Sequence, residues 1–263
     1  MRGIARNVQW LVRPQFLAGF TLLCLVVWGM GLHGRPQPLP AITVAPSQVK
    51  GAIAPAFAAR QSPDCAVVAC LALTFDDGPD RRITPQVLDT LQRQQVRATF
   101  FLIGREVPGK EDIVRRMHAE GHEIGNHSYN HADFTKLTPE AMQAELQSTQ
   151  QVIAGAGVPV PRIFRPPYGA VTPAVRAHVG LPMIRWDIDT DDWLSKDPAK
   201  ITEHLIHDTH PGGIILMHDK YHATLDALEP AIQALKQHYQ FVTISELQGL
   251  SAGDQGQFFG RTP

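Results

Sequence analysis

From residue 67 onward, short apolar runs alternate with amphipathic segments in which apolar residues recur every three or four positions. The apolar runs predict strands at Val67–Phe75, Arg97–Ile103, His122–Asn126, Ile163–Arg165, Met183–Ile188, Gly213–His218 and Phe241–Ile244. The amphipathic segments predict helices at Thr84–Gln95, Glu111–Glu120, Thr138–Ala154, Pro198–His207 and Leu225–His238. Strands that alternate with helices predict parallel β/α units, and therefore an α/β fold with a mostly parallel sheet or barrel.

The N-terminal residues 1–34 have the pattern of a membrane leader. Phe16–Leu32 is a run of 17 residues without charge, and Arg2, Arg6 and Arg13 precede it. This length lies at the low end of a membrane-spanning helix and slightly above the apolar region of a secretory signal. We favour an uncleaved anchor with its N-terminus in the cytoplasm, and a cleaved signal peptide is the alternative. Either leader exports the rest of the chain to the outside of a bacterial cell membrane.

Residues 35–63 hold six prolines among small residues, a composition typical of an extended linker. The folded domain is predicted at residues 64–250, and the glycine-rich, polar segment 251–263 is predicted to be a flexible tail. Cys65 and Cys70 begin the domain, with four residues between them. In an exported protein we expect them to form a disulfide, which requires a tight hairpin; two free buried thiols are the alternative.

Charge is strongly segregated along the chain. The total of 24 Lys and Arg against 25 Asp and Glu gives a net charge of −1. Residues 1–63 carry six basic and no acidic side chains, so residues 64–263 have a net charge of −7. A domain of this charge gives no general reason to expect nucleic-acid binding, which calls for clustered Lys and Arg. We expect a single exported globular domain, monomeric, whose contact with the membrane is limited to the leader.

Polar residues that could act in catalysis or bind a metal gather at the ends of five predicted strands. They lie within Thr74–Pro79, His127–His131, Arg165–Gly169, Trp186–Trp193 and Ile215–Asp219. Because the carboxyl ends of parallel strands meet at one edge of a sheet or barrel, we expect these segments to form one site.

Each cluster has a functional and a structural interpretation. Asp76 and Asp77 can divide metal binding and proton acceptance between them, although Asp-Asp-Gly-Pro is also good turn chemistry. His127 and His131, four residues apart, can share a metal ion with a third ligand from elsewhere, or they are two solvated loop histidines. Arg165 can grip a carboxylate, or it is a surface residue before a proline turn.

The remaining clusters are weaker signals when taken alone. The acids between Trp186 and Trp193 lack the spread of oxygen ligands ending in Glu that calcium loops have. A lone His218 at the end of a buried strand is more often a satisfied core histidine than a functional one. His204, His207 and His210 recur on a predicted helix, and we interpret them as a solvated face.

Together and in this order, the clusters resemble the five motifs of the polysaccharide deacetylase family, the NodB-homology domain of carbohydrate esterase family 4. The matches are TFDDGP at 74–79, HSxxH at 127–131, RxPYG at 165–169, DxxDW at 189–193 and LxH at 216–218. The resemblance covers roughly residues 66–248 and implies a distorted (β/α) barrel. Asp187 and Asp191 are minor departures that remove no catalytic group.

The resemblance implies a role for each motif residue. Asp77, His127 and His131 would bind a divalent metal, most simply Zn²⁺, with Co²⁺ or Fe as alternatives, and water in the open position. Asp76 would be the general base, oriented by Arg165. His218 would be the general acid, tuned by Asp192. The backbone N–H of Tyr168 would meet the oxyanion, and Trp193 and Leu216 would wall the pocket.

The implied reaction is metal-dependent removal of N-acetyl groups from an N-acetylated polysaccharide. Because the leader places the domain beside the cell envelope, peptidoglycan amino sugars are the first predicted substrate and chitin-type oligomers the second. O-deacetylation of acetylated xylan is the near alternative. An inactive glycan-binding module is the alternative from another class, and the intact Asp76, His127, His131 and His218 argue against it.

Overall fold

The computed structural model describes residues 62–260. The predicted leader (1–34), almost all of the predicted linker (35–63) and the last three residues lie outside the described residues. Within residues 62–260, no helix is both long and apolar enough to cross a membrane.

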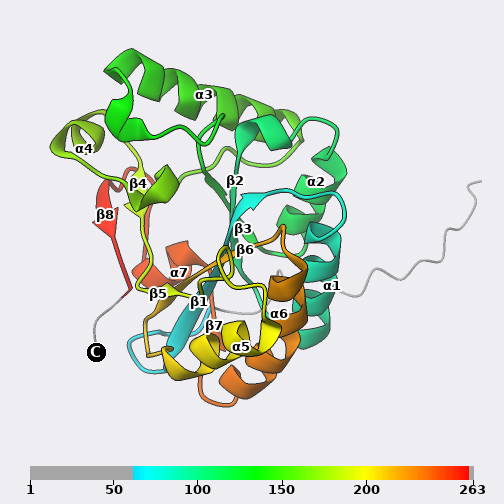
Figure 1. Cartoon of the computed structure of the whole chain (residues 1–263). Helices are drawn as coiled ribbons and strands as arrows, with labels where there is room; N and C mark the ends of the chain where they lie inside the picture. Colours follow the sequence, from blue (N-terminus) through cyan, green and yellow to red (C-terminus); the bar gives the residue numbers. More distant parts are fainter. Residues whose placement is uncertain (1–61, 261–263) are drawn as a thin grey trace, which may run out of the picture. The chain divides into compact units, whose positions relative to one another are not determined.

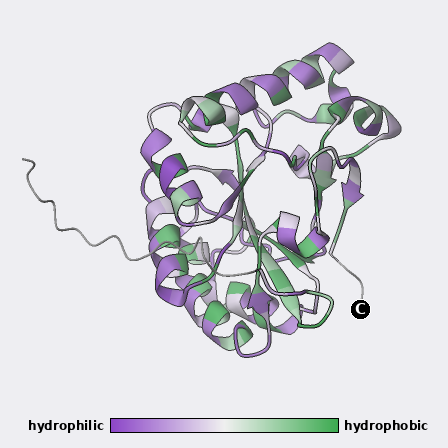
Figure 2. Cartoon of the chain, turned by 180° about the vertical axis from the view of Figure 1, so that it is seen from behind, coloured by the Kyte–Doolittle hydropathy of each residue, from purple (hydrophilic) through white to green (hydrophobic). Residues whose placement is uncertain are grey.

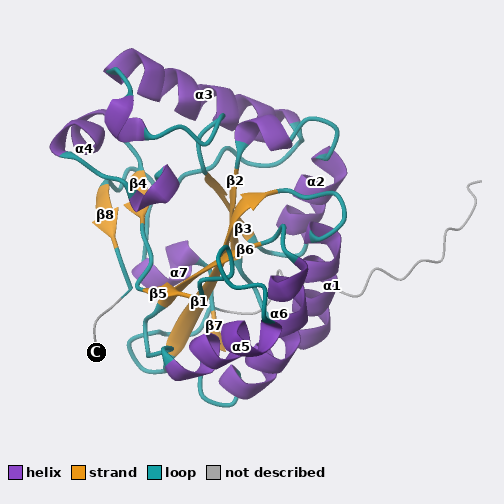
Figure 3. Cartoon of the chain, in the orientation of Figure 1, coloured by secondary structure: helices purple, strands orange, loops and turns teal. Residues whose placement is uncertain are grey.

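A six-stranded parallel sheet lies at the centre of the described chain (Figures 1 and 3). Its strands are β1 (Cys70–Gly78), β2 (Thr99–Leu102), β3 (Glu123–Asn126), β5 (Ile188–Asp189), β6 (Ile214–His218) and β7 (Gln240–Phe241). Their order is β3-β2-β1-β6-β5, and β7 pairs with the first two residues of β1. The long apolar strand β1 is therefore central, and the predicted α/β fold with parallel pairing is confirmed.

Short links extend this sheet at the β3 edge. Asn126 of β3 forms an isolated parallel bridge with Phe164, and Phe164 forms another with Met183. Met183 belongs to β4 (Pro182–Ile184), which pairs in parallel with β8 (Gly256–Phe258). The strands thus follow one another around a curve from β5 to β8, an arrangement consistent with an open, distorted barrel (Figure 1).

Helices cover the outside of the strands. They are α1 (Thr84–Gln94), α2 (Glu111–Ala119), α3 (Pro139–Gly155), α4 (Pro173–Val179), α5 (Pro198–His207), α6 (His222–Leu235) and α7 (Ile244–Gln248), with short 3₁₀ turns η2 (Gly104–Glu106), η3 (Phe134–Lys136) and η4 (Pro167–Gly169). The largest apolar cluster joins β1, β2 and β6 to the inner faces of α1, α2, α5 and α6. Hydrophilic and hydrophobic residues alternate along these outer helices, as amphipathic packing requires (Figure 2).

Local sequence explains where several helices begin. Thr138, Thr172 and Asp197 cap α3, α4 and α5 by accepting a hydrogen bond from a backbone N–H of the first turn. Each cap is followed by a proline, whose fixed φ suits the first helical position and whose missing N–H has no partner to lose there. Thr138, the first residue of a predicted helix, is therefore the cap of α3, which begins one residue later.

The first strand begins later than predicted because its first residues belong to a turn. Cys65 and Cys70 form a disulfide with their Cα atoms 5.4 Å apart, so the predicted bond is present. The N–H groups of Val67 and Val68 donate to the carbonyl of Asp64, and the side chain of Val67 is 79% exposed. The loop enclosed by the disulfide thus turns back before β1 can start at Cys70.

Other differences from the predicted elements arise where the paired strand segments are too short to produce a recognisable hydrophobic pattern. The segment Met183–Ile188 is divided into β4 and β5, and only Phe164 of the predicted strand at 163–165 takes part in a bridge. The predicted strand Phe241–Ile244 stops early because Thr243 caps α7. The hydrophobic pattern does not indicate α4, α7 or β8, and β8 lies in the segment predicted to be a flexible tail.

Candidate functional site

One pocket collects side chains from all five polar clusters at the carboxyl ends of the strands. Its volume is about 410 Å³. It is lined by Asp76, Asp77, His127, His131, Tyr168, Trp186, Asp189, Trp193, Leu216, His218 and Tyr221. The expectation that these segments meet at one edge is therefore correct, because β1, β3, β5 and β6 all end there.

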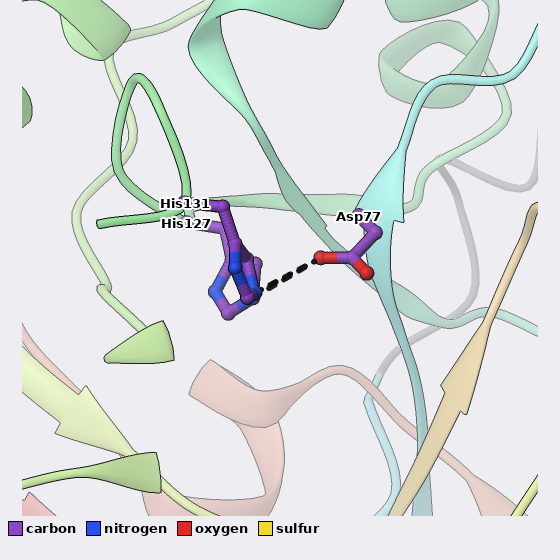
Figure 4. Close-up of side chains that lie close together, drawn as sticks. All are labelled: Asp77, His127 and His131. Carbon is purple, nitrogen blue, oxygen red and sulfur yellow. Dashed lines mark ion pairs between the residues drawn. The ribbon is translucent and has the colours of Figure 1, made fainter. Parts of the chain in front are cut away.

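Asp77, His127 and His131 face one another across the pocket (Figure 4). Asp77 lies near the end of β1, and both histidines lie in the loop after β3. The Asp77 Oδ1 atom is 3.5 Å from Nε2 of His127 and 3.4 Å from Nε2 of His131. One potential ligand atom from each residue lies within 4.8 Å of the others, the spacing of a shared metal ion.

The surroundings of these three residues fit a divalent metal. Nδ1 of His127 donates to the backbone carbonyl of Arg165 at 2.8 Å, which leaves the lone pair of Nε2 directed at Asp77. The buried Asp77 Oδ1 has no hydrogen-bond partner, as expected of an atom that a metal would satisfy. Burial raises the pKa of Asp77. Neighbouring positive charges outweigh this effect and lower the pKa to about 2; they come from His127, from Lys220, which also donates a hydrogen bond, and from His218. The carboxylate is therefore ionised, as a ligand must be.

Asp76 has different partners from Asp77. Its Oδ1 accepts a hydrogen bond from Nη1 of Arg165 at 2.8 Å, and its Oδ2 lies 3.6 Å from Nε2 of His127. Arg165 is completely buried, and it also donates to Thr74 Oγ1 and lies over the ring of Phe101. Burial lowers the pKa of Arg165, and the charge of Asp76 opposes that shift. Arg165 thus holds one oxygen of Asp76 and leaves the other facing His127.

His218 lies opposite Asp76 in the parallel register of β1 and β6. Its Nδ1 and its backbone N–H both contact the carboxylate of Asp192 at 2.7 Å, and Thr224 donates to the same carboxylate at 2.6 Å. Burial lowers the pKa of His218, but the hydrogen bond and charge of Asp192 outweigh it and raise the pKa above its usual value. Asp192 therefore favours the protonated form of His218 beside the pocket.

Backbone strain is concentrated in the polar clusters. Among residues 62–260, six non-glycine residues have a positive φ, and all except Gln95 belong to these clusters: Asp77, Ser128, His131, Tyr168 and Asp191. Such a conformation costs energy and persists where the surrounding structure enforces it, often at functional sites. At Tyr168 it forms the turn η4 beside His131, whose ring centroid is 4.7 Å from that of Tyr168.

His207, His210 and Asp187 do not line the pocket. His207 is solvent-exposed on α5, in line with the predicted solvated face, whereas His210 pairs with Asp187 at 3.0 Å. Asp187 also accepts from the backbone N–H of Ile214. In the part of the chain that the structure describes, Asp77, His127 and His131 are the one group of side chains arranged to hold a metal, so the acids at 187–192 do not form a second site.

Four groups near the site were not singled out as site residues by sequence. Trp186, Asp189 and Tyr221 line the pocket, and Nζ of Lys220 lies 2.5 Å from Asp77 Oδ2. Asp189 is the first acid of the DxxDW motif, and this was the available signal. Lys220 and Tyr221 follow His218 closely, but no spacing rule indicates that the turn after β6 folds back over β1.

The sequence matches the family described as polysaccharide deacetylase over residues 65–181. It is 40% identical over 193 residues to a peptidoglycan-N-acetylglucosamine deacetylase of Listeria monocytogenes, covering 73% of this chain and 41% of that protein. It is 38% identical over 172 residues to a chitooligosaccharide deacetylase of Bradyrhizobium, covering 64% of this chain and 78% of that protein. The chain thus spans about two fifths of the length of the Listeria relative.

Solved structures give the same assignment. A structure described as T48 deacetylase with substrate has 39% identity and a TM-score of 0.71, covering 74% of this chain and 99% of that one. A family 4 acetyl xylan esterase from Clostridium thermocellum in complex with a cobalt ion has 37% identity and a TM-score of 0.66, covering 68% and 90%. The fold and pocket define an α/β domain with a candidate metal site at the carboxyl ends of its strands. The chain belongs to the polysaccharide deacetylase family, carbohydrate esterase family 4.

Proposed function

We propose that the protein is a metal-dependent hydrolase that removes N-acetyl groups from an N-acetylated polysaccharide of the cell envelope. The observation that carries this proposal is the pairing of Asp76 with His218 across one pocket that also contains Asp77, His127 and His131. Amide hydrolysis needs a base and a separate acid, because an amine is a poor leaving group unless it is protonated. The pocket supplies both.

Asp76 is the general base in this proposal. The oxygen that Arg165 does not hold faces Nε2 of His127 at 3.6 Å, so it can take the proton of a water molecule that lies against the ligand group. Arg165 orients Asp76 and balances its charge in a buried setting. A divalent metal bound to Asp77, His127 and His131 would polarise the acetyl carbonyl and activate that water.

His218 is the general acid. Asp192 holds its Nδ1 and sustains its protonated form, so Nε2 is the atom that donates to the departing amine. The backbone N–H of Tyr168, on the strained turn η4, is proposed to stabilise the oxyanion. Trp193 and Leu216 line the same pocket and form its apolar wall beside the acetyl group.

We propose peptidoglycan amino sugars as the first substrate and chitin-type oligomers as the second. The relatives named for peptidoglycan and for chitooligosaccharide deacetylation support both. The leader pattern in residues 1–34 supports action outside the cytoplasmic membrane. Zn²⁺ is the proposed metal because two imidazoles and a carboxylate suit it, and the cobalt-containing relative supports Co²⁺ as a functional substitute.

The test is release of acetate by the purified chain from peptidoglycan, chitooligosaccharides and acetylated xylan. Each reaction is run with chelator, with Zn²⁺ and with Co²⁺, and free amines are measured alongside acetate. Metal-dependent release of both products from an amino sugar substrate is the expected result. No metal-dependent acetate from any substrate would contradict the enzymatic proposal and favour a glycan-binding module.

Acetylated xylan is the substrate of the second candidate function. The similarity to the acetyl xylan esterase of Clostridium thermocellum is the specific observation in its favour, because the same site can cleave an ester. Acetate from xylan alone, with no free amine from the other substrates, would assign the protein to O-deacetylation.

A further inference from the structure

We propose that Lys220 is a positioning residue that holds one oxygen of Asp77 so that the other oxygen alone faces the two histidines. This inference rests on the proposed metal-dependent function. It concerns a lysine that none of the five motifs contains. The turn after β6 would then help to shape the metal site, while β6 itself carries the proposed general acid His218.

The two oxygens of Asp77 have separate partners. Nζ of Lys220 donates to Oδ2 at 2.5 Å. Oδ1 lies 3.5 Å and 3.4 Å from the Nε2 atoms of His127 and His131 and has no hydrogen-bond partner. A carboxylate can bind a metal through one oxygen or through both, and a hydrogen bond to the second oxygen favours binding through one.

Lys220 acts through Asp77 because its own side chain does not line the pocket. It lies in the short connection between His218, which ends β6, and α6, and its side chain is 35% exposed. Its Nζ lies 5.3 Å from the ring centroid of Tyr221, which lines the pocket. The ammonium group thus contacts Oδ2 of Asp77, whereas His127 and His131 lie beside Oδ1.

The same contact separates the ligand from the acid. Asp77 Oδ2 is 4.0 Å from Nε2 of His218, just beyond hydrogen-bonding distance. If Lys220 did not hold Oδ2, a small rotation of Asp77 would bring it into hydrogen-bonding distance of His218. By engaging Oδ2, Lys220 keeps the Nε2 atom of His218 available for the substrate.

The test compares Lys220→Met and Lys220→Arg with the wild-type chain. Lys236→Met is the matched control, since Nζ of Lys236 contacts Gln94 at 2.7 Å on the outer surface and no site residue. Two quantities are measured without substrate: the affinity for Co²⁺ and Zn²⁺ by competition with a chelator, and the intensity of the visible absorption of bound Co²⁺, which reports the coordination number. Thermal unfolding verifies that each variant is folded.

We expect Lys220→Met to bind metal about tenfold or more weakly, because Asp77 loses the partner that orients it. The variant should also show a weaker Co²⁺ absorption, because a second carboxylate oxygen joins the coordination. Lys220→Arg should restore both readings, and Lys236→Met should equal the wild type. Unchanged affinity and absorption in Lys220→Met would overturn the proposal. Tighter binding would also overturn it, since Lys220 would then act only as a repelling charge.

These outcomes are distinguishable from failure of the proposed function. A wild-type chain that binds metal but releases no acetate from any substrate would contradict the function and leave the role of Lys220 testable by affinity and absorption. A wild-type chain that binds no divalent metal would overturn both proposals.

Discussion

Asp76 and Asp77 are adjacent in sequence, yet their carboxylates have different partners. Arg165 holds Asp76, whereas Lys220 and the two histidines surround Asp77. The difference arises from β1, where the pairing register shifts between Asp76 and Gly78 and Asp77 adopts a φ of 72°. Neighbouring residues of a strand already point to opposite faces, and this irregularity lets both carboxylates reach the same pocket.

Replacement of the two aspartates should therefore have different consequences. Asp76→Asn removes the proposed base but no metal ligand, so turnover should fall by about 10² to 10⁴ while metal content is retained. Asp77→Asn should lower metal content. Acetate release and metal analysis of the same purified samples test this. Metal loss in Asp76→Asn with retention in Asp77→Asn would show that the two roles are assigned the wrong way round.

Asp192 should set the alkaline limit of the reaction. It raises the pKa of His218 against the opposing effect of burial, so His218 remains protonated to a higher pH than an ordinary histidine. Asp192→Asn removes that charge and lowers the pKa of His218. The alkaline limb of the kcat profile should then move to lower pH, and maximal kcat should fall. A profile with an unmoved alkaline limb would argue against His218 as the proton donor.

At the scale of the secondary structure elements, periodicity predicts the long elements and fails for the short ones. The helix Pro198–His207 matches α5, and the helix predicted at Thr84–Gln95 matches α1 except for its last residue. In contrast, β5 has two residues and β8 has three, too few for an alternating pattern. β8 exists because it pairs with β4, a contact between distant segments that the local composition of the tail does not indicate.

The same reasoning applies to the site. The five clusters could be predicted because each follows a strand and their order resembles a known family. The contacts of Lys220 and Asp219 could not be predicted, because they depend on how the connection from β6 to α6 packs on the end of β1. Asp219 is completely buried there and accepts a hydrogen bond from Thr84 at 2.5 Å.

This packing makes Gly78 a sensitive position between β1 and α1. A Cβ atom at Gly78 would lie 2.4 Å from Oδ1 of the buried Asp219, a side chain that Thr84 holds in place. Gly78→Ala should therefore lower the free energy of unfolding by about 1–3 kcal/mol. Gly155→Ala, at the end of α3 with no atom within 4 Å of the new Cβ, is the control and should be neutral or slightly stabilising.

Denaturant unfolding of four chains tests the cause: wild type, Gly78→Ala, Asp219→Ala and the double variant. If the clash with the carboxylate is the cause, Gly78→Ala should lower the free energy of unfolding by less in the Asp219→Ala background than in the wild type. Equal costs in both backgrounds would assign the effect to the backbone at residue 78 instead.

For the whole molecule, the formal charge of −7 on residues 64–263 overstates the negative charge at the site. Asp76 faces Arg165, Asp77 faces Lys220, and Asp192 faces His218, so three of the acids are matched by a base within hydrogen-bonding distance. The basic excess in residues 1–63 lies in the predicted leader and linker. The near-neutral total therefore describes neither part of the chain.

Among the described residues, Asp219 has no such base beside it, and it should make the stability of the whole domain depend on pH. Burial raises its pKa from 3.8 to about 7, and its Oδ1 has no hydrogen-bond partner. The folded chain therefore holds the carboxyl proton of Asp219 more tightly than the unfolded chain does. The stabilising effect is fully present below pH 4, declines as pH rises from about 4 to 7, and is lost above 7.

Between about pH 4 and pH 7, the ionisation of Asp219 should lower the free energy of unfolding by roughly 4 kcal/mol at most. Asp219→Asn carries no titrating group, so wild type should lose stability relative to this variant between pH 5 and pH 8. Denaturant unfolding of both proteins in chelator, at the two pH values, measures the difference. Asp112→Asn, at an exposed position in the first turn of α2, is the control and should follow the wild type. A wild-type loss equal to that of Asp219→Asn would mean that Asp219 ionises as readily in the folded chain as in the unfolded one.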